Sequence, residues 1–207
     1  MTYNEYEKKI CNIKKSKLTR LDLISFIIKT TNAKSYLEIG CKYNFVFDNI
    51  DVENKVGVDP WQGGNCRMTS DEFFASNTQK FDIIFIDGDH NCYQAKKDVY
   101  NSLRCLNTNG VIIMHDMLPE SEASTVVSNH GDVWKVNFDL IKEKNLLYKI
   151  VEIDWGCGVI LPGTQNTKKI KMKRKTVQNW NDYVEYFHKL PIVSYKEFTE
   201  LLTTMEK

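Results

Sequence analysis

The stretch Phe81-Asp82-Ile83-Ile84-Phe85-Ile86-Asp87-Gly88-Asp89-His90 decides how the rest of the chain is interpreted. It begins as a run of apolar and β-branched residues, which is too short for a free-standing helix and typical of a strand buried on both faces. It ends in two carboxylates and an imidazole around a glycine. Ligands of open α/β sheets bind at the carboxyl ends of the strands, so this end is a candidate site. A polar turn capping the next helix would explain one aspartate but not the whole group.

Further strands and helices are predicted on both sides of this stretch. Buried strands are expected at 35–40, 55–59 and 111–114, a very short one at 66–68, and an antiparallel hairpin at 148–153 and 157–161 joined by Asp154-Trp155-Gly156. Helices are expected at 19–31, 43–50, 70–74, 92–106 and 133–141, with Asn109-Gly110 as a turn before strand 111–114. Thr19 is the predicted N-cap of the first helix, and Asn32 ends it in a left-handed turn. This alternation predicts an α/β sandwich with a mainly parallel sheet.

Composition excludes several classes of protein. The chain has 207 residues, of which 42% are hydrophobic, and a formal net charge of +1. A single core is therefore available, and the net charge does not favour nucleic acid or an anionic membrane. No apolar run approaches the ~20 residues of a membrane span, and the N-terminus lacks a signal-peptide pattern. The six cysteines contain no CxxC pair, which indicates neither a zinc site nor a disulfide framework and favours a reduced, cytoplasmic location.

Two regions are distinguished by composition. Residues 1–163 contain the strands, preceded by an N-terminal helical arm, and residues 164–207 form a basic linker and a C-terminal helical extension. The run 168–175 is strongly basic, but no aromatic residue is interleaved for base stacking, so a solvated segment is expected rather than a nucleic-acid site. Whether the extension covers a pocket or mediates a homo-oligomer stays open at this stage.

One candidate site follows the first predicted strand. Glu38-x-Gly40 ends that strand, and a glycine there lets the backbone pass close to a ligand. Asp59 ends the following strand, where an acid can hydrogen-bond ribose hydroxyls. The segment Gly40-Cys41-Lys42-Tyr43-Asn44 lacks the further glycines of a pyrophosphate loop. A nucleoside without a diphosphate therefore fits better than a dinucleotide, although a glycine that merely ends a strand is about as plausible for this motif alone.

The second candidate site joins two strand ends. Asp87, Asp89 and His90 follow one strand, and His115 and Asp116 follow the strand predicted to be its neighbour. Clusters rich in oxygen ligands suit Mg²⁺, Mn²⁺ or Ca²⁺, and a divalent ion can lower the pKa of a substrate hydroxyl. Solvated carboxylates that cap loops are the simpler alternative. Two such ends side by side favour a functional site.

Four motifs in this order resemble one family. They are Tyr36-Leu37-Glu38-Ile39-Gly40, Val56-Gly57-Val58-Asp59-Pro60, the opening stretch 81–90, and Gly110-Val111-Ile112-Ile113-Met114-His115-Asp116. Together they resemble the class I S-adenosylmethionine-dependent methyltransferases over about residues 35–161, with the macrocin-type sugar O-methyltransferases as the nearest branch. The resemblance implies a Rossmann-like sandwich with a six- or seven-stranded sheet, S-adenosylmethionine as cofactor, and O-methylation of a small hydroxylated acceptor such as a sugar or glycan.

The resemblance also implies roles for individual residues. Glu38 and Gly40 would line the methionine end of the cofactor, Asp59 would hold its ribose, Met68 and Thr69 would lie near the adenine, and Asp87 would stand at the methyl-transfer pocket. Metal-dependent relatives hold Mg²⁺ at positions that read Asp87, His115 and Asp116 here, and a histidine at 115 departs from their acid pair. Asp89 or His90 would be the general base. Asn44 stands where a further glycine is usual, and asparagine tolerates positive φ.

Two other classes of function remain as alternatives. The glycine-poor first loop is compatible with a module that binds S-adenosylmethionine without catalysis. An NAD(P)-dependent oxidoreductase on a similar sheet is disfavoured by the missing glycines.

Overall fold

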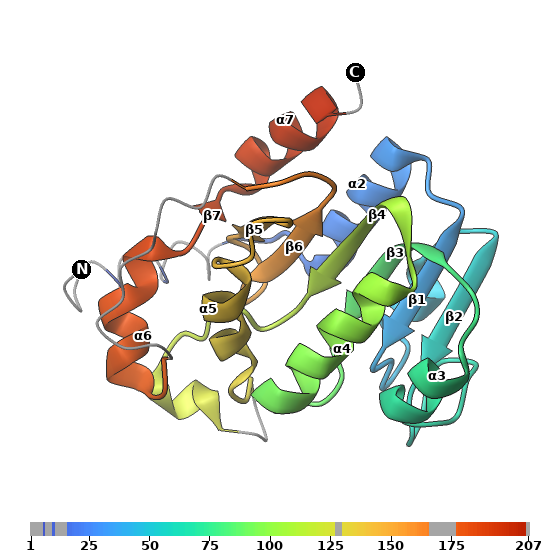
Figure 1. Cartoon of the computed structure of the whole chain (residues 1–207), viewed down its shortest axis with the longest axis horizontal. Helices are drawn as coiled ribbons and strands as arrows, with labels where there is room; N and C mark the ends of the chain where they lie inside the picture. The colour runs from blue at the N-terminus through green and yellow to red at the C-terminus, as the bar shows by residue number, and fades with distance from the viewer. Residues whose placement is uncertain (1–5, 7–9, 11–15, 127–129, 166–176, 206–207) are drawn as a thin grey trace.

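The computed structural model describes residues 6, 10, 16–126, 130–165 and 177–205. Within them one seven-stranded sheet has the order β2-β1-β3-β4-β6-β5-β7, with helices on both faces (Figure 1). The strands are β1 (Ser35–Ile39), β2 (Asn54–Val58), β3 (Phe81–Ile86), β4 (Leu106–Met114), β5 (Leu147–Val151), β6 (Cys157–Leu161) and β7 (Ile192–Val193). The α-helices are α2 (Arg20–Thr31), α3 (Ser70–Ser76), α4 (Cys92–Arg104), α5 (Asn137–Leu140), α6 (Trp180–Tyr186) and α7 (Tyr195–Met205).

The pairing of the strands confirms the predicted fold class. β1 pairs in parallel with both β2 and β3, and β3 pairs in parallel with β4. β6 runs antiparallel to both β4 and β5, which is the predicted C-terminal hairpin. The short β7 adds a parallel edge strand beside β5. The carboxyl ends of β1 to β4 therefore meet along one edge of the sheet.

β3 is buried on both faces, as its apolar run predicts. Ile84 and Ile86 join the core beneath α3, α4, α5 and α6, while Ile83 and Phe85 join the core beneath α2 and α7. Figure 1 shows α4 in front of the sheet and α2 behind it. Alternate side chains of one strand thus contribute to two cores, which is why the segment reads as continuously hydrophobic.

Three local predictions are wrong in detail. Residues 66–68 form only an isolated bridge between Val58 and Cys66, because the loop after β2 returns to that strand for a single pair. The helix expected at 43–50 is reduced to a 3-10 turn, Phe47–Asn49, since positive φ angles at Lys42 and Asn44 interrupt the chain before it. β4 begins at Leu106 instead of 111, and the expected turn at 109–110 lies within it, where the register with β3 shifts.

Both chain-terminal regions pack onto the domain where they are described. The Tyr6 hydroxyl donates a hydrogen bond to the Pro119 carbonyl, and the Tyr6 ring meets Trp180, Tyr183 and Phe187 edge to face. On the opposite face α7 packs against α2. The basic run predicted at 168–175 lies outside the described residues.

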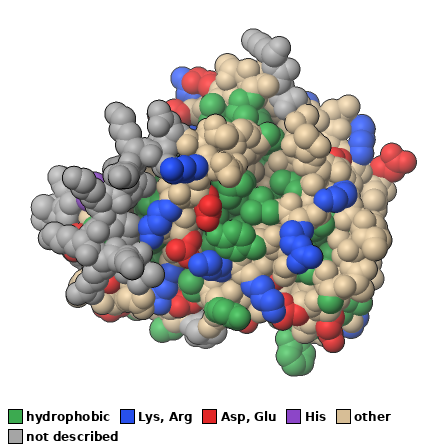
Figure 2. Space-filling model, in the orientation of Figure 1, with side chains coloured by type: hydrophobic (Ala, Val, Ile, Leu, Met, Phe, Trp, Pro, Cys, Tyr) green, Lys and Arg blue, Asp and Glu red, His purple; other side chains and the backbone are tan. Residues whose placement is uncertain are grey.

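The surface carries no single block of positive charge on the face seen in Figure 2, where described Lys and Arg side chains are interspersed with Asp and Glu. Across the described residues, no helix has the length and apolar character needed to cross a membrane.

Candidate functional site

A crevice opens at the carboxyl ends of β1 to β4. Its volume is about 1170 Å³, above the range of roughly 300–1,000 Å³ that is usual for a site that holds one small ligand. The loops after β1 and β2, the beginnings of α3 and α4, and the turn between β5 and β6 complete its walls. The crevice is therefore large enough for two small molecules bound side by side.

The crevice brings together nearly all the residues that the sequence proposes for the site. The lining includes Glu38, Gly40, Asp59, Thr69, Asp87, Asp89, His90, His115 and Asp116. Met68 is the exception, since it is not among the lining residues and packs against the core beneath α3 and α4. Thr69 lines the crevice but also serves as the N-cap of α3, where its side chain accepts a hydrogen bond from the Glu72 amide.

Gly40 marks the place where the backbone of the loop after β1 crosses the loop after β3. Its φ is +87°, and a Cβ there would lie 2.3 Å from the Asp87 carbonyl oxygen and 2.5 Å from the Gly88 Cα. The Asp87 amide donates to the Ile39 carbonyl at 2.8 Å, which holds the two loops together. Only glycine fits this crossing, so a bare stretch of backbone lines the crevice between the ends of β1 and β3.

Glu38 is a buried carboxyl group beside this crossing. It is 2% exposed, and the Tyr36 hydroxyl donates a hydrogen bond to its Oε2 at 2.5 Å. Burial is the main influence and raises the pKa of Glu38 to about 8, although the hydrogen bond from Tyr36 opposes the change. Among the described residues no cationic side chain is in hydrogen-bond contact with Glu38. A buried acid in this setting suits a ligand that brings a positive charge, such as an amino group.

Asp59 ties the loops after β1 and β2 to each other. Its Oδ2 accepts hydrogen bonds from the Cys41 and Lys42 amides, and its Oδ1 accepts from the Trp61 and Gln62 amides. Burial alone would raise the pKa of Asp59, but these four backbone donors lower it. A carboxylate offers about four lone-pair positions, so a ribose hydroxyl has to replace one of these donors to bind Asp59.

The loop after β1 has a backbone conformation, with positive φ angles, that glycine adopts more often than other residues. Lys42 and Asn44 have positive φ angles of 47° and 61°. The Asn44 side-chain oxygen accepts a hydrogen bond from the Gly64 amide at 2.6 Å, which joins the loops after β1 and β2 a second time. The prediction that asparagine tolerates positive φ at position 44 is confirmed, and its side chain adds a contact that glycine cannot make.

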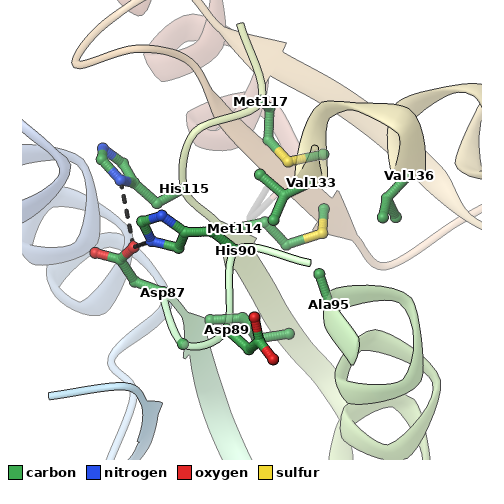
Figure 3. Close-up of a pocket in the computed structure, with 11 residues that line it drawn as sticks. Asp87, Asp89, His90, Ala95, Met114, His115, Met117, Val133 and Val136 are labelled. Carbon is green, nitrogen blue, oxygen red and sulfur yellow. Dashed lines mark ion pairs between the residues drawn. The ribbon is translucent and has the colours of Figure 1, made fainter. Parts of the chain in front are cut away.

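Asp87, His90 and Asp116 form a compact group at the ends of β3 and β4. His90 Nε2 lies 3.6 Å from Asp87 Oδ1 and 3.7 Å from Asp116 Oδ2. Within the described residues, one atom from each of these three side chains lies within 4.8 Å of the others, a spacing that could hold a metal ion. Figure 3 shows His90 and His115 both directed at the Asp87 carboxylate, beside a small apolar pocket lined by Met114 and Val133.

His115 lies next to this group but belongs to a second network. Its Nδ1 is 3.2 Å from Asp116 Oδ1 and 3.5 Å from Asp87 Oδ1, and its Nε2 is 3.6 Å from Asp154 Oδ2. Arg20 Nη1 donates to Asp154 Oδ2 at 2.9 Å. The metal-like spacing thus includes His90 where the sequence proposes His115.

These contacts shift the charge states of the whole cluster. Burial disfavours a protonated His115 ring, but the carboxylates of Asp87 and Asp154 outweigh this effect and raise the pKa of His115 to about 10. Burial alone would also raise the pKa of Asp87, but His115, His90 and Arg20 hold it well below its usual range. Asp116 differs, because burial and the neighbouring Asp87 charge raise its pKa. The site therefore holds a charged Asp87–His115 pair beside a less acidic Asp116.

Asp89 has a different environment from the rest of the group. Its side chain is exposed, and its Oδ1 accepts a hydrogen bond from the Asn91 amide at 3.0 Å, just before α4 begins. Of the two residues proposed as general base, His90 is the one that contacts Asp87 and Asp116.

Comparisons with known proteins agree with the α/β fold. Residues 52–117 match the sequence model of a methyltransferase domain. The fold is similar to a Staphylococcus aureus structure assigned as a caffeoyl-CoA O-methyltransferase, with a TM-score of 0.54 and 20% identity over 79% of this chain and 93% of that one.

The chain thus has the α/β fold of these methyltransferases. An O-methyltransferase from Bacillus cereus in complex with S-adenosylhomocysteine is also similar (TM-score 0.53, 14% identity, 78% of this chain and 92% of that one). So is the O-methyltransferase TomG from Streptomyces achromogenes, involved in tomaymycin synthesis and bound to S-adenosylmethionine (0.51, 12%, 77% and 88%). Among curated proteins none matches the sequence. At these identities the solved structures establish the fold alone.

The sequence does not predict a role for two charged or titratable residues of the crevice, Arg20 and His130, or for Asp154, which pairs with Arg20 beside it. Arg20 is 134 positions from its partner Asp154, and neither residue follows one of the parallel strands β1 to β4. The sequence gives one weak signal, the tight turn at 154–156 between two strands. His130 carries no local signal, because it lies in a polar loop.

Proposed function

We propose that this domain transfers the methyl group of S-adenosylmethionine to a hydroxyl oxygen of a small acceptor, such as a sugar or a glycan. The observation that carries the proposal is the single crevice that contains both the Glu38–Gly40 end of β1 and the Asp87–His90–Asp116 group. A transferase has to hold a donor and an acceptor at once, and the volume of the crevice allows this.

The cofactor would lie along the loops after β1 and β2. The buried acid Glu38 would face the amino group of the methionine end, and the Gly40 backbone would allow close approach. Asp59 would meet the ribose by exchanging one of its backbone donors. Thr69 lies at the start of α3, where the adenine is proposed, and Met68 would contribute only through its backbone.

His90 would act as the general base for the acceptor hydroxyl. S-adenosylmethionine supplies an activated methyl group on a sulfonium sulfur. As the hydroxyl oxygen forms its bond to the methyl carbon, the bond from that carbon to sulfur breaks and its electron pair stays on sulfur. The hydroxyl proton passes to His90 Nε2, where the nearby Asp87 and Asp116 stabilise the imidazolium.

A divalent cation is a second proposed component of the same site. Asp87, His115 and Asp116 are the residues that the resemblance assigns to it, and the geometry favours Asp87, His90 and Asp116. One imidazole and two carboxylates suit Mn²⁺ as well as Mg²⁺. A bound ion would lower the pKa of the acceptor hydroxyl. His90 Nε2 would then be a ligand of the ion instead of the general base.

The proposal is tested by thermal unfolding of the purified chain with S-adenosylmethionine, S-adenosylhomocysteine or NAD, each with and without Mg²⁺ or Mn²⁺. Because a ligand that binds only the folded state raises the unfolding temperature, both adenosyl compounds should stabilise the protein and NAD should not. Stabilisation by NAD alone would favour the oxidoreductase alternative. Stabilisation by the adenosyl compounds, with no transfer to any hydroxylated acceptor, would favour the non-catalytic binding module.

A further inference from the structure

The turn between β5 and β6 holds a tryptophan in a strained backbone conformation. Asp154, Trp155 and Gly156 have successive φ angles of 44°, 56° and 85°. Glycine adopts this left-handed region easily, whereas a bulky aromatic residue seldom does. Residues in strained conformations cluster at ligand sites, where the surrounding structure holds them in place.

The surrounding structure does hold this turn. The Arg20 amide and Nη1 both donate to Asp154 Oδ2 at 2.9 Å. On the other side, the Leu118 amide donates to the Trp155 carbonyl at 2.8 Å and the Met117 amide donates to the Gly156 carbonyl at 3.0 Å. The turn is therefore fixed to α2 and to the segment that follows β4, and the indole has a defined position at the crevice.

The Trp155 indole forms part of the crevice wall instead of packing into a core. It is 41% exposed and lines the crevice, whereas Trp134 is 2% exposed and packs in the core. Its ring centroid lies 5.3 Å from that of His130 and 6.3 Å from that of His115. The three rings form an aromatic corner next to the carboxylate of Asp116.

His130 brings a buried polar atom to this corner. Its side chain is 10% exposed, and its Nε2 lies 3.9 Å from Asp116 Oδ1. Its Nδ1 is buried without a hydrogen-bond partner in the described structure. Buried polar atoms are nearly always paired in folded proteins, so an unpaired one in a residue that lines a crevice indicates the place of a ligand's polar group.

The proposed catalytic group lies between the aromatic corner and the part of the crevice where the cofactor is proposed to bind. Asp87 is next to the Gly40 crossing, His90 connects Asp87 to Asp116, and Asp116 contacts His130. A molecule bound against Trp155 and His130 would thus have its polar groups near Asp116 and His90. This is the position that a methyl acceptor requires.

We propose that Trp155 and His130 form the acceptor subsite, in which the indole packs on the face of a hydroxylated six-membered ring and His130 Nδ1 hydrogen-bonds a hydroxyl beside the one that is methylated. The inference rests on the proposed methyl transfer. An aromatic face attracts the C–H groups of a sugar ring as well as the edge or face of an aromatic ring. The chemistry shared by both kinds of acceptor is a six-membered ring that has an apolar face and adjacent hydroxyls.

The test uses the intact chain saturated with S-adenosylhomocysteine. Binding of methyl α-D-glucopyranoside, methyl α-D-mannopyranoside and 3,4-dihydroxybenzoate is measured by calorimetry, and methylation of the same probes is followed with S-adenosylmethionine. The variants are Trp155→Gly, which suits the left-handed backbone, and His130→Phe, which keeps a ring but removes the nitrogens. Tyr93→Ala is the control, since Tyr93 is 77% exposed and does not line the crevice.

Each subsite variant should weaken binding of at least one probe by about tenfold, the loss expected for one ring contact or one hydrogen bond. Affinity for S-adenosylhomocysteine should stay within about twofold of wild type, and Trp155→Phe should recover part of the loss. Preference for glycosides over the dihydroxybenzoate identifies a sugar, and the reverse identifies an aromatic diol. If no probe binds the saturated protein, or if both variants bind the probes as wild type does, the subsite is wrong. Failure of S-adenosylhomocysteine itself to bind would overturn the proposed function as well.

Discussion

The crossing at Gly40 provides a direct test of how the crevice is built. In Gly40→Ala, the φ of +87° costs about 1–2 kcal/mol for an L residue. The new Cβ would also overlap the Asp87 carbonyl and the Gly88 Cα, which are backbone atoms that cannot rotate away. Relieving such an overlap costs about 1–3 kcal/mol, and the stiffer unfolded chain returns about 0.4–1 kcal/mol. The free energy of unfolding should therefore fall by about 2–4 kcal/mol.

Gly88→Ala is the matched control on the other side of the same crossing. Gly88 has no positive φ, and its Cβ would lie 3.3 Å from the Ile39 Cγ2, which is a side-chain methyl group. Its free energy of unfolding should stay within about 1 kcal/mol of wild type. In calorimetry, the melting temperature of Gly40→Ala should fall by roughly 5–15 °C for a domain of this size. Titration should show that Gly40→Ala also loses affinity for S-adenosylhomocysteine. If the two variants are equally stable and bind the ligand equally, the close crossing does not shape the site.

Three further predictions follow from the polar groups of the crevice. Because the pKa of Glu38 is raised to about 8 in the folded chain from an ordinary value of 4.5, the folded state keeps a proton that the unfolded chain releases across this interval. The free energy of unfolding should therefore fall as pH rises from 5 to 8, by at most about 1.4 kcal/mol per pH unit. The fall should be smaller in Glu38→Gln. If urea titrations give both proteins the same dependence on pH, the raised pKa of Glu38 is wrong. His90→Ala should abolish methyl transfer while ligand binding persists, whereas Asp89→Asn should keep most of the activity because that side chain is exposed; equal losses in a transfer assay would show that both act. Asp154→Asn should lower the free energy of unfolding by about 2–4 kcal/mol, because Arg20 and His115 lose the carboxylate that they share; an unchanged urea midpoint would exclude a stabilising role for this network.

Local sequence patterns predict the structure of two kinds of segment correctly. One is a strand that is buried on both faces, and the other is a helix end that is capped by residues next to it in the sequence. The run 81–86 is a buried strand because apolar side chains on both of its faces meet a core. Thr19 and Asp22 form the predicted start of α2, and Asn32 ends it at φ 52°, since capping involves only neighbouring residues. The acids at the strand ends are predicted for the same reason, because parallel strands place their carboxyl ends along one edge.

Local signals fail where a distant segment decides the outcome. The asparagine and glycine at 109–110 predict a turn before a strand, but pairing with β3 begins already at Leu106 and absorbs those residues in a shift of register. Met68 follows the second strand as expected, yet core packing beneath α3 and α4 draws its side chain away from the crevice. In both cases tertiary contacts with residues distant in the sequence outweigh the local preference of the segment.

The α/β sheet, the site at its carboxyl edge and several of the polar residues that line it can be predicted from the sequence, because these depend on the order of the strands and on the residues that end each strand. Which of those residues act together is seen only once the chain is folded. Asp154 reaches Arg20 across 134 positions, and His90, instead of His115, completes the group with Asp87 and Asp116. These contacts depend on how separate loops are held against one another in the folded chain. The spacing of residues along the sequence does not predict the distances between such loops.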